Sequence, residues 1–179
     1  MNFCGRRFNL YFVPAVLLLL LAAGCALMKR EKEPVALLRV HLESESSLVS
    51  NTQTISVMRS QPVLVNIGND PILTEADIVA ARVLDTAGGG FAVEVKFDET
   101  GSWSLEQSSA ANPGKHLAIF GQWSDQPGDG RWLAAPLIAR RIASGTLTFT
   151  PDASREEMEQ LVKGLNEDAK KNAGMKSKE

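Results

Sequence analysis

The sequence contains few of the residue types on which several classes of protein depend. Its 179 residues include only two cysteines, two histidines and one tyrosine, and aromatic residues make up 6%. A chain with so few cysteines is not a disulfide-rich scaffold, and the composition is not that of collagen or a coiled coil. The net charge of -2 provides no general field for nucleic acid, and few rings are present to stack on bases. We therefore exclude nucleic acid as a partner.

Long apolar runs are also scarce, and the one at the start of the chain has the order of a secretory signal. Arg6 and Arg7 precede an apolar stretch from Leu10 to Ala23, and small residues follow it. The stretch has about 14 residues, short of the roughly 20 that a helix needs to cross a bilayer, and Pro14 interrupts it. We predict a signal over residues 1–24 that does not persist as a membrane span.

The end of this segment, Leu21-Ala22-Ala23-Gly24-Cys25, resembles the lipobox of bacterial lipoproteins. The resemblance implies that Cys25 is the lipidated first residue of the mature chain, although Ala22 stands where such motifs most often have Leu. The alternative is a plain signal that is cleaved near Ala23 and leaves a free thiol. Because Cys4 would leave with the signal, the mature domain would have no thiol for a disulfide or a zinc site.

Lipidation would place the protein at the cell envelope. Several acyl chains anchor a protein stably, whereas a single chain binds a membrane only marginally. We therefore expect a domain that is tethered to the membrane through its N-terminal lipid and faces the periplasm. Ala26 stands where an Asp retains many enterobacterial lipoproteins at the inner membrane, which favours the outer membrane. Charged residues as far as Pro34 predict a linker over 25–34.

The rest of the chain predicts one domain over residues 35–166 and a flexible charged tail over 167–179. Two-residue alternation and β-branched residues predict strands, of which Phe91–Phe97, after three consecutive glycines, is the clearest. The predicted strands are 35–43, 52–58, 63–67, 78–85, 91–97, 117–120, 133–138 and 146–150. Thr74 is placed to cap one short helical turn before the fourth of them.

Two helices are expected among these strands. The first, over residues 98–111, ends at the breaker Asn112-Pro113-Gly114. The second begins at the capping-box pair Ser154 and Glu157 and runs to Leu165, with apolar residues at i, i+3, i+4 and i+7. Because helices and strands do not alternate regularly, we predict an α+β fold, a mainly antiparallel sheet with two helices packed on one face.

The order of motifs in the second half of the chain is that of a known family. The motifs are Val93-Glu94-Val95-Lys96-Phe97-Asp98, Gly101, Asn112, Gly114-Lys115, Leu117-Ala118-Ile119, Ala135-Pro136-Leu137-Ile138 and Gly145, followed by the capped helix. This order resembles the head subdomain of the first periplasmic domain of SecD, the protein-export membrane subunit. The resemblance covers residues 72–166, and it implies a SecD-head-like fold and contact with extended polypeptide.

Two segments depart from the family pattern. Leu147–Asp152 lacks the glycine that SecD usually has after its penultimate strand, and the loop Gly121–Arg131 is longer and more polar than the family's tight hairpin. No transmembrane bundle follows the head-like region, whereas SecD couples its head to membrane helices that move protons. We therefore expect a non-enzymatic binding module linked to protein export, and not a pump.

No motif assembles a catalytic site. His41 shares its strand parity with Arg39, so we expect His41 to be exposed, and His116 lies at a strand entry. There is no Gly-x-Ser-x-Gly elbow, and a strand rather than a helix follows the three glycines. We expect no catalytic residue, no cofactor and no metal site. The alternative is a small-ligand-binding protein or a hydrolase that uses the loop 125–131 with His116 or Asp129.

The tryptophans are the best candidates for a binding surface, because a Trp side chain covers a large area at little entropic cost. We select Trp123 and Trp132, with Arg131 beside the latter, as candidate partner-binding residues. Packing in the core or at its rim is the alternative for Trp132 and for Trp103. An extended client could also add a strand to an open sheet edge. The predicted partner is a protein or an extended polypeptide.

Overall fold

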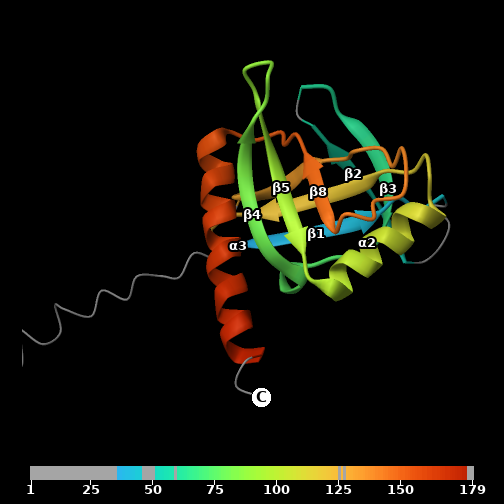
Figure 1. Ribbon diagram of the computed structural model, residues 1–179. Helices are drawn as coiled ribbons and strands as arrows, with labels where there is room; N and C mark the ends of the chain where they lie inside the picture. The colour runs from blue at the N-terminus through green and yellow to red at the C-terminus, as the bar shows by residue number, and fades with distance from the viewer. Residues whose placement is uncertain (1–35, 46–50, 59, 125, 127, 177–179) are drawn as a thin grey trace, which may run out of the picture. The chain divides into compact units, whose positions relative to one another are not determined.

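The structure is a computed structural model that describes residues 36–45, 51–58, 60–124, 126 and 128–176 (Figure 1). The predicted signal over 1–24, the lipidation site Cys25 and the predicted linker over 25–34 lie outside the described residues. In the described part, antiparallel strands combine with two long helices and one 3-10 turn. The α+β prediction is confirmed.

All pairings between the strands are antiparallel, and the strands are divided among three small sheets. Sheet A has the order β1-β6-β7, sheet B is the hairpin β2-β3, and sheet C has the order β4-β5-β8. The strands are β1 Leu37–Leu42, β2 Thr52–Val57, β3 Val63–Gly68, β4 Ile78–Asp85, β5 Phe91–Phe97, β6 Leu117–Gln122, β7 Gly130–Ala134 and β8 Thr146–Phe149. Most of them lie where alternation and β-branched residues predict them.

Sheet A is the middle layer, and each of its faces contributes residues to a hydrophobic core. Leu38, Val40 and Ile119 enter the main hydrophobic core, to which sheet C and both helices also contribute. Ala118 lies in a second, smaller core formed with the inner side chains of sheet B. Because side chains alternate between the faces of a strand, sheet A supplies both cores at once.

His41 is buried, with 6% of its surface exposed, so the prediction of an exposed histidine is wrong. Its Nδ1–H donates to the carbonyl oxygen of Gly68 at 2.9 Å, and its ring meets Trp132 edge-on with 5.4 Å between centroids. An isolated bridge between Glu43 and Ile67 brings β3 against the end of β1. Sheet B therefore covers the end of the β1 face that alternation assigns to solvent, at His41, whereas Arg39 on the same face is exposed.

Helix α2 (Glu99–Ala111) begins where Asp98 accepts a hydrogen bond from the N–H of Gly101 at 2.9 Å. A Cβ at Gly101 would lie 2.9 Å from the Cβ of Asp77, which belongs to the 3-10 turn η1 (Glu75–Asp77) that follows Thr74 as predicted. Leu105 is fully buried in the main core, whereas Trp103 is 61% exposed. Trp103 therefore does not pack in the core, because it lies half a turn away from the buried face.

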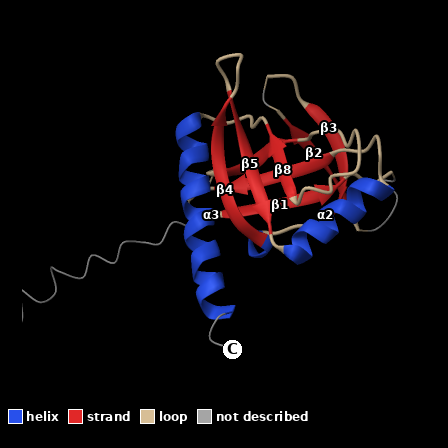
Figure 2. Ribbon diagram, in the orientation of Figure 1, coloured by secondary structure: helices blue, strands red, loops and turns tan. Residues whose placement is uncertain are grey.

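Helix α3 (Arg155–Lys176) packs along β4 at the side of sheet C (Figure 2). The predicted capping box is present, with the N–H of Ser154 donating to Glu157 and the N–H of Glu157 donating to the Ser154 hydroxyl. Its large apolar side chains, which the periodicity identified, are fully or almost fully buried: Met158, Leu161 and Leu165.

The prediction that a flexible tail begins at residue 167 is wrong, because α3 continues to Lys176. On the added turns, Ala169 and Ala173 line a hollow of about 300 Å³ together with Ile78 and Val79 at the start of β4. These apolar side chains are small, and a search for large apolar residues at helical spacing does not detect them.

The strand predicted over 133–138 lies earlier in the chain, as β7 (Gly130–Ala134). Gly130 pairs with Gln122 and Arg131 pairs with Gly121, so β6 and β7 form a longer hairpin than apolar residues alone indicate. A Cβ at Gly121 would lie 2.5 Å from Leu133 Cδ1, so the strand can pass there only because this residue is glycine. Close packing, and not alternation, determines where this hairpin extends.

Candidate functional site

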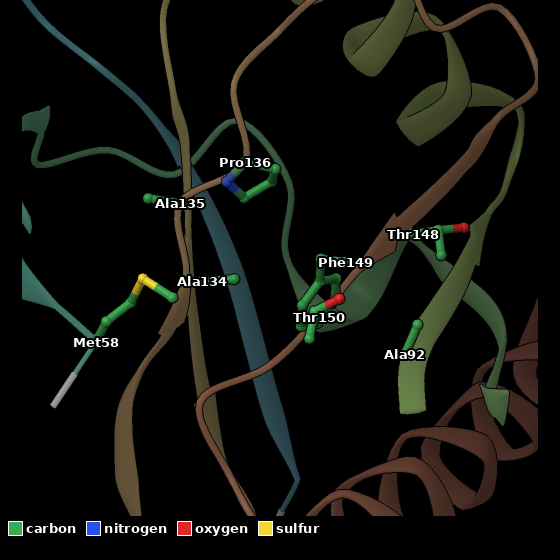
Figure 3. A pocket seen from close by; sticks show the side chains of 8 residues that line it. All are labelled: Met58, Ala92, Ala134, Ala135, Pro136, Thr148, Phe149 and Thr150. Atoms are coloured by element: carbon green, nitrogen blue, oxygen red, sulfur yellow. The ribbon is translucent and has the colours of Figure 1, made fainter. Parts of the chain in front are cut away.

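Two neighbouring hollows meet at Met58, and we call them together the Met58 groove. The first has a volume of about 380 Å³ and the second about 520 Å³. The first is lined by Met58, Ala92, Ala134, Ala135, Pro136, Thr148, Phe149 and Thr150 (Figure 3). The second is lined by Met58, Ser56, Pro62, Phe120, Gly130, Arg131, Trp132 and Asp152. The groove thus lies along β7 and along the segment that leaves β8.

Met58 follows the last residue of β2 and is 46% exposed. Its φ of 69° is in the left-handed region, which non-glycine residues seldom adopt. In Figure 3 its side chain reaches from the β2 side toward Ala134 and Ala135. A thioether side chain is flexible and adapts to apolar groups of different shapes. Met58 therefore supplies an adjustable apolar wall to both hollows.

The second hollow has an aromatic wall and a polar end. Trp132 is half-buried and packs edge-on against Phe120, with ring centroids 5.4 Å apart. At the polar end, Arg131 donates to Glu157 Oε2 at 2.5 Å and to the carbonyl oxygen of Asp152 at 3.2 Å. The guanidinium group is thus fixed in place, and its charge is largely balanced by a carboxylate.

Other parts of the chain cover both edges of sheet A. At the β1 edge, the N–H of Val40 donates to the carbonyl oxygen of Leu73 at 2.9 Å. At the β7 edge, the N–H of Asp152 donates to the carbonyl oxygen of Leu133 at 2.7 Å. These bonds use main-chain groups that would otherwise be available for pairing with another chain.

Sheet C has one covered edge and one open edge. At β4, the side-chain amide of Asn166 bonds both main-chain groups of Ala81, accepting from its N–H and donating to its carbonyl oxygen, each at 2.9 Å. At β8, on the opposite edge, Thr148 is exposed and lines the first hollow of the Met58 groove. The open edge of the sheet therefore borders the groove.

The sequence matches the family described as SecDF, P1 head subdomain, over residues 48–169, which is more than half of the chain. The chain belongs to the SecDF P1 head family. The match begins before the region 72–166 in which the motifs were recognised, so it includes the β2-β3 hairpin and Met58. That hairpin has no distinctive short motif, only β-branched residues that many strands share.

Two solved structures have the same fold. A structure described as the crystal structure of SecDF in a super-membrane-facing form matches with a TM-score of 0.55 and 23% identity, over 75% of this chain and 19% of that chain. A structure of a membrane component SecDF that enhances protein export matches with a TM-score of 0.53 and 20% identity, over 93% of this chain and 71% of that chain. This P1 head chain thus spans less than a fifth of the first protein. A comparison with curated proteins found no match.

The three predicted partner-binding residues of this P1 head domain have different surroundings. Trp123 is only 6% exposed and belongs to the main core, so it offers no accessible surface and its selection is corrected. Its ring is covered by Arg131, whose Cζ lies 4.8 Å from the ring centroid. Trp132 and Arg131 do line the Met58 groove. Sequence reasoning missed Met58, because a single methionine at the end of a strand has no recognisable pattern.

The alternative site on the loop 125–131 does not include His116. Residues 125 and 127 lie outside the described part; within it, Asp129 accepts a hydrogen bond from the Ser124 hydroxyl just after β6. His116 precedes β6, which separates the two groups by six residues, or about 20 Å of extended chain. A base and a nucleophile that act together must lie within hydrogen-bond reach. The geometry therefore does not favour this alternative.

His116 forms a local hydrogen-bonded pair with Glu43 instead. Its Nδ1 lies 2.7 Å from Glu43 Oε2, and its main-chain N–H donates to the same oxygen at 2.8 Å. Burial alone would raise the pKa of Glu43, but the two hydrogen bonds and the nearby charges of His116 and Lys115 outweigh it, so the net pKa is lowered. The pair joins the end of β1 to the start of β6.

Two general features concern the described residues alone. No group of three His, Cys, Asp or Glu side chains among them is placed to hold a metal ion. None of the helices in this part of the chain is long and apolar enough to span a bilayer.

Proposed function

We propose that this SecDF P1 head domain is a non-enzymatic binding module of the bacterial cell envelope that holds an extended polypeptide in the Met58 groove. The observation that carries the proposal is that Met58 borders two open hollows, with volumes of about 380 and 520 Å³. Two adjacent open hollows suit an extended chain better than a compact small molecule, which proteins usually enclose in a single deep pocket.

The chemistry of the groove supports the same proposal. Ala134, Ala135 and Pro136 form a wall of short side chains, and Met58 and Trp132 offer apolar surface of different shapes. Short walls admit a main chain, and adaptable apolar residues accept different side chains without demanding one sequence. Such a surface is suited to binding many polypeptides weakly.

We further propose that lipidation at Cys25 tethers the domain to a membrane, on its periplasmic face and favouring the outer membrane. The lipobox and the charged linker before residue 35 support this address. One relative by fold is described as a membrane component that enhances protein export. We propose that this chain contributes to export by holding an exported polypeptide while it is still extended.

Photocrosslinking from single positions tests the binding site. A photoreactive amino acid is placed at Met58, at Trp132 or at the exposed control position Trp103, in the full-length protein in detergent. The probe is a nine-residue fluorescein-labelled peptide with Val and Leu two positions apart among Ser and Thr residues, and with Lys at each end. We expect labelling from 58 and 132, and at least tenfold less from 103, because α2 presents Trp103 outside the groove. Equal labelling from all three positions would refute the proposed site.

The anchor is tested separately by Cys25→Ser. We expect the unchanged protein to carry acyl chains by intact-mass analysis and to sediment with membranes. The variant is expected to lose both properties, because the thiol is the only attachment point that the motif provides. A variant that still sediments with membranes would contradict the proposed anchor without affecting the peptide-binding proposal.

A further inference from the structure

The hydrogen-bond ladder between β5 and β8 determines which main-chain groups of β8 remain available. The N–H of Phe97 donates to the carbonyl oxygen of Gly145 at 3.0 Å. In an antiparallel pair, hydrogen-bonded and non-hydrogen-bonded positions alternate. Leu147 and Phe149 therefore direct their main-chain groups toward β5, and Thr148 directs its N–H and its carbonyl oxygen away from sheet C.

Thr148 is the residue of β8 at which both outward groups are available. At Thr146 the hydroxyl of Ser144 lies within 3.3 Å of the main-chain nitrogen and of the carbonyl oxygen. Within the described residues, the main-chain groups of Thr148 have no hydrogen-bond partner, and the residue is exposed. It thus offers one donor and one acceptor, side by side, to an incoming strand.

Space for such a strand is present next to this edge. Thr148 and Thr150 form one side of the first hollow, and Ala134, Ala135 and Pro136 form the other (Figure 3). A paired strand lies about 4.8 Å from its neighbour, so an added strand needs open space beside β8. The three short residues on the far side leave that room.

From these observations we infer that an extended polypeptide adds to sheet C as a strand beside β8, pairing its main chain with both outward groups of Thr148. The inference rests on the proposed polypeptide binding and specifies its mode. Main-chain pairing supplies affinity that does not depend on sequence, and every second side chain of the bound segment lies in the Met58 groove. The preferred segment has apolar residues at alternate positions and no proline at the paired residue.

The length of the groove identifies the occupant as another polypeptide and not a second copy of this chain. β8 has only four residues, so two copies paired through it would share a very short ladder. The groove continues past the end of β8 to Met58 and Trp132, which a second β8 would leave empty. A longer extended segment occupies both parts.

Backbone methylation of the peptide tests this mode on the unaltered protein. The nine-residue fluorescein-labelled peptide described above is N-methylated at one residue at a time, and its binding to the full-length protein in detergent is followed by fluorescence anisotropy. Because one N–H of the bound strand donates to the carbonyl oxygen of Thr148, methylation at that one position is expected to weaken binding at least tenfold. Methylation at the neighbouring positions, whose N–H groups point to the other side of the strand, is expected to change the affinity less than twofold.

A matched pair of protein variants provides the second measurement. Thr148→Pro removes the outward N–H, at an edge position where proline is tolerated because that group takes no part in the ladder. Thr148→Val keeps the N–H and the β-branched shape. We expect at least tenfold weaker binding for the proline variant and less than twofold change for the valine variant. If Thr148→Pro does not fold by circular dichroism, the methylation series decides alone.

The possible results separate the mode of binding from the proposed function. Binding that tolerates methylation at every position, with labelling from Met58 retained, overturns strand addition and leaves the groove as the site. No detectable binding of any peptide overturns both. The protein could instead form dimers that Thr148→Pro abolishes, and bind no peptide. That result would assign the edge to a second copy and overturn the inference.

Discussion

The two edges of sheet C show how one domain closes a strand edge and leaves another open. At β4, helix α3 covers the strand, and Asn166 occupies both main-chain groups of Ala81 as a neighbouring strand would. At β8, Thr148 is exposed beside the Met58 groove. Unpaired edges invite association, so an open edge that borders a hollow indicates a place where pairing is useful.

The contrast also separates stability from binding. The closed edge is held by large buried side chains and by two partly buried hydrogen bonds, so damage there affects folding. The open edge contributes one exposed residue to the surface, so changes there affect association and leave the fold intact. The following experiments test this division, beginning with the largest expected effect.

Removal of the apolar contact beneath α3 is expected to have the largest effect. Leu161 is fully buried in the main core. We expect Leu161→Ala to lower the free energy of unfolding by about 3 kcal/mol, because it removes buried apolar surface and leaves a cavity. Urea denaturation measures the change. The exposed Lys163→Ala on the same helix is the control and is expected to stay within about 0.5 kcal/mol of the unchanged protein. Equal effects of the two variants would show that α3 is not docked as described.

Opening the β4 edge itself is expected to have the next largest effect. Asn166→Ala leaves the N–H and the carbonyl oxygen of Ala81 without partners, which is expected to cost about 2 kcal/mol. Amide hydrogen exchange compares the two edges directly: we expect the N–H of Ala81 to be protected and the N–H of Thr148 to exchange fast. In the variant, only the Ala81 signal is expected to lose protection. Similar exchange at both sites in the unchanged protein would remove the distinction between the edges.

The start of β8 provides a smaller test. Gly145 has a φ of +64°, and a Cβ there would collide with the hydroxyl oxygen of Ser102. We expect Gly145→Ala to lower the melting temperature by an amount equivalent to about 1.5 kcal/mol, through backbone strain and this collision. The double variant Gly145→Ala with Ser102→Gly is expected to recover the part that comes from the collision. If the double variant melts at the same temperature as Gly145→Ala, backbone strain at residue 145 accounts for the whole loss of stability.

The smallest expected effect lies away from both edges and depends on pH. The pKa of Glu43 is lowered from 4.5, so the hydrogen bonds of its ionised carboxylate stabilise the fold above that pH, and this contribution is lost as the pH falls through the lowered value. We expect Glu43→Gln to reduce the stability at pH 7 by less than about 1 kcal/mol and to flatten its decline below pH 4.5. Denaturation series from pH 7 to pH 3 measure this change. Parallel declines for both proteins would contradict the role of the pair.

Local signals predict much of the fold, and the failures have physical causes. Thr74, Asp98 and Ser154 start their helical segments as their capping chemistry requires, and Phe91–Phe97 is a strand as its alternation requires. His41 was assigned to solvent and is buried, because a second sheet covers its face. The small residues that extend α3 to Lys176 are equally invisible to periodicity.

The candidate site was predicted only in part. Trp132 and Arg131 line the groove, whereas Trp123 lies in the core beneath the Arg131 guanidinium. Met58, Ala134 and Thr148 come from separate parts of the sequence and have no shared pattern. Their proximity follows from the way sheets B and C lie on either side of β7.

The sequence by itself predicted the export signal and the lipobox. It also determined the order of the strands along the chain and the residues at which the helices begin. All of these features depend on residues that lie close together along the chain. Only the tertiary structure decided which strand edges are covered. Asn166 closes the β4 edge from 85 residues away, and the groove beside Thr148 exists because β7 and β8 belong to different sheets. Contacts between distant segments depend on packing, and local propensity does not specify them.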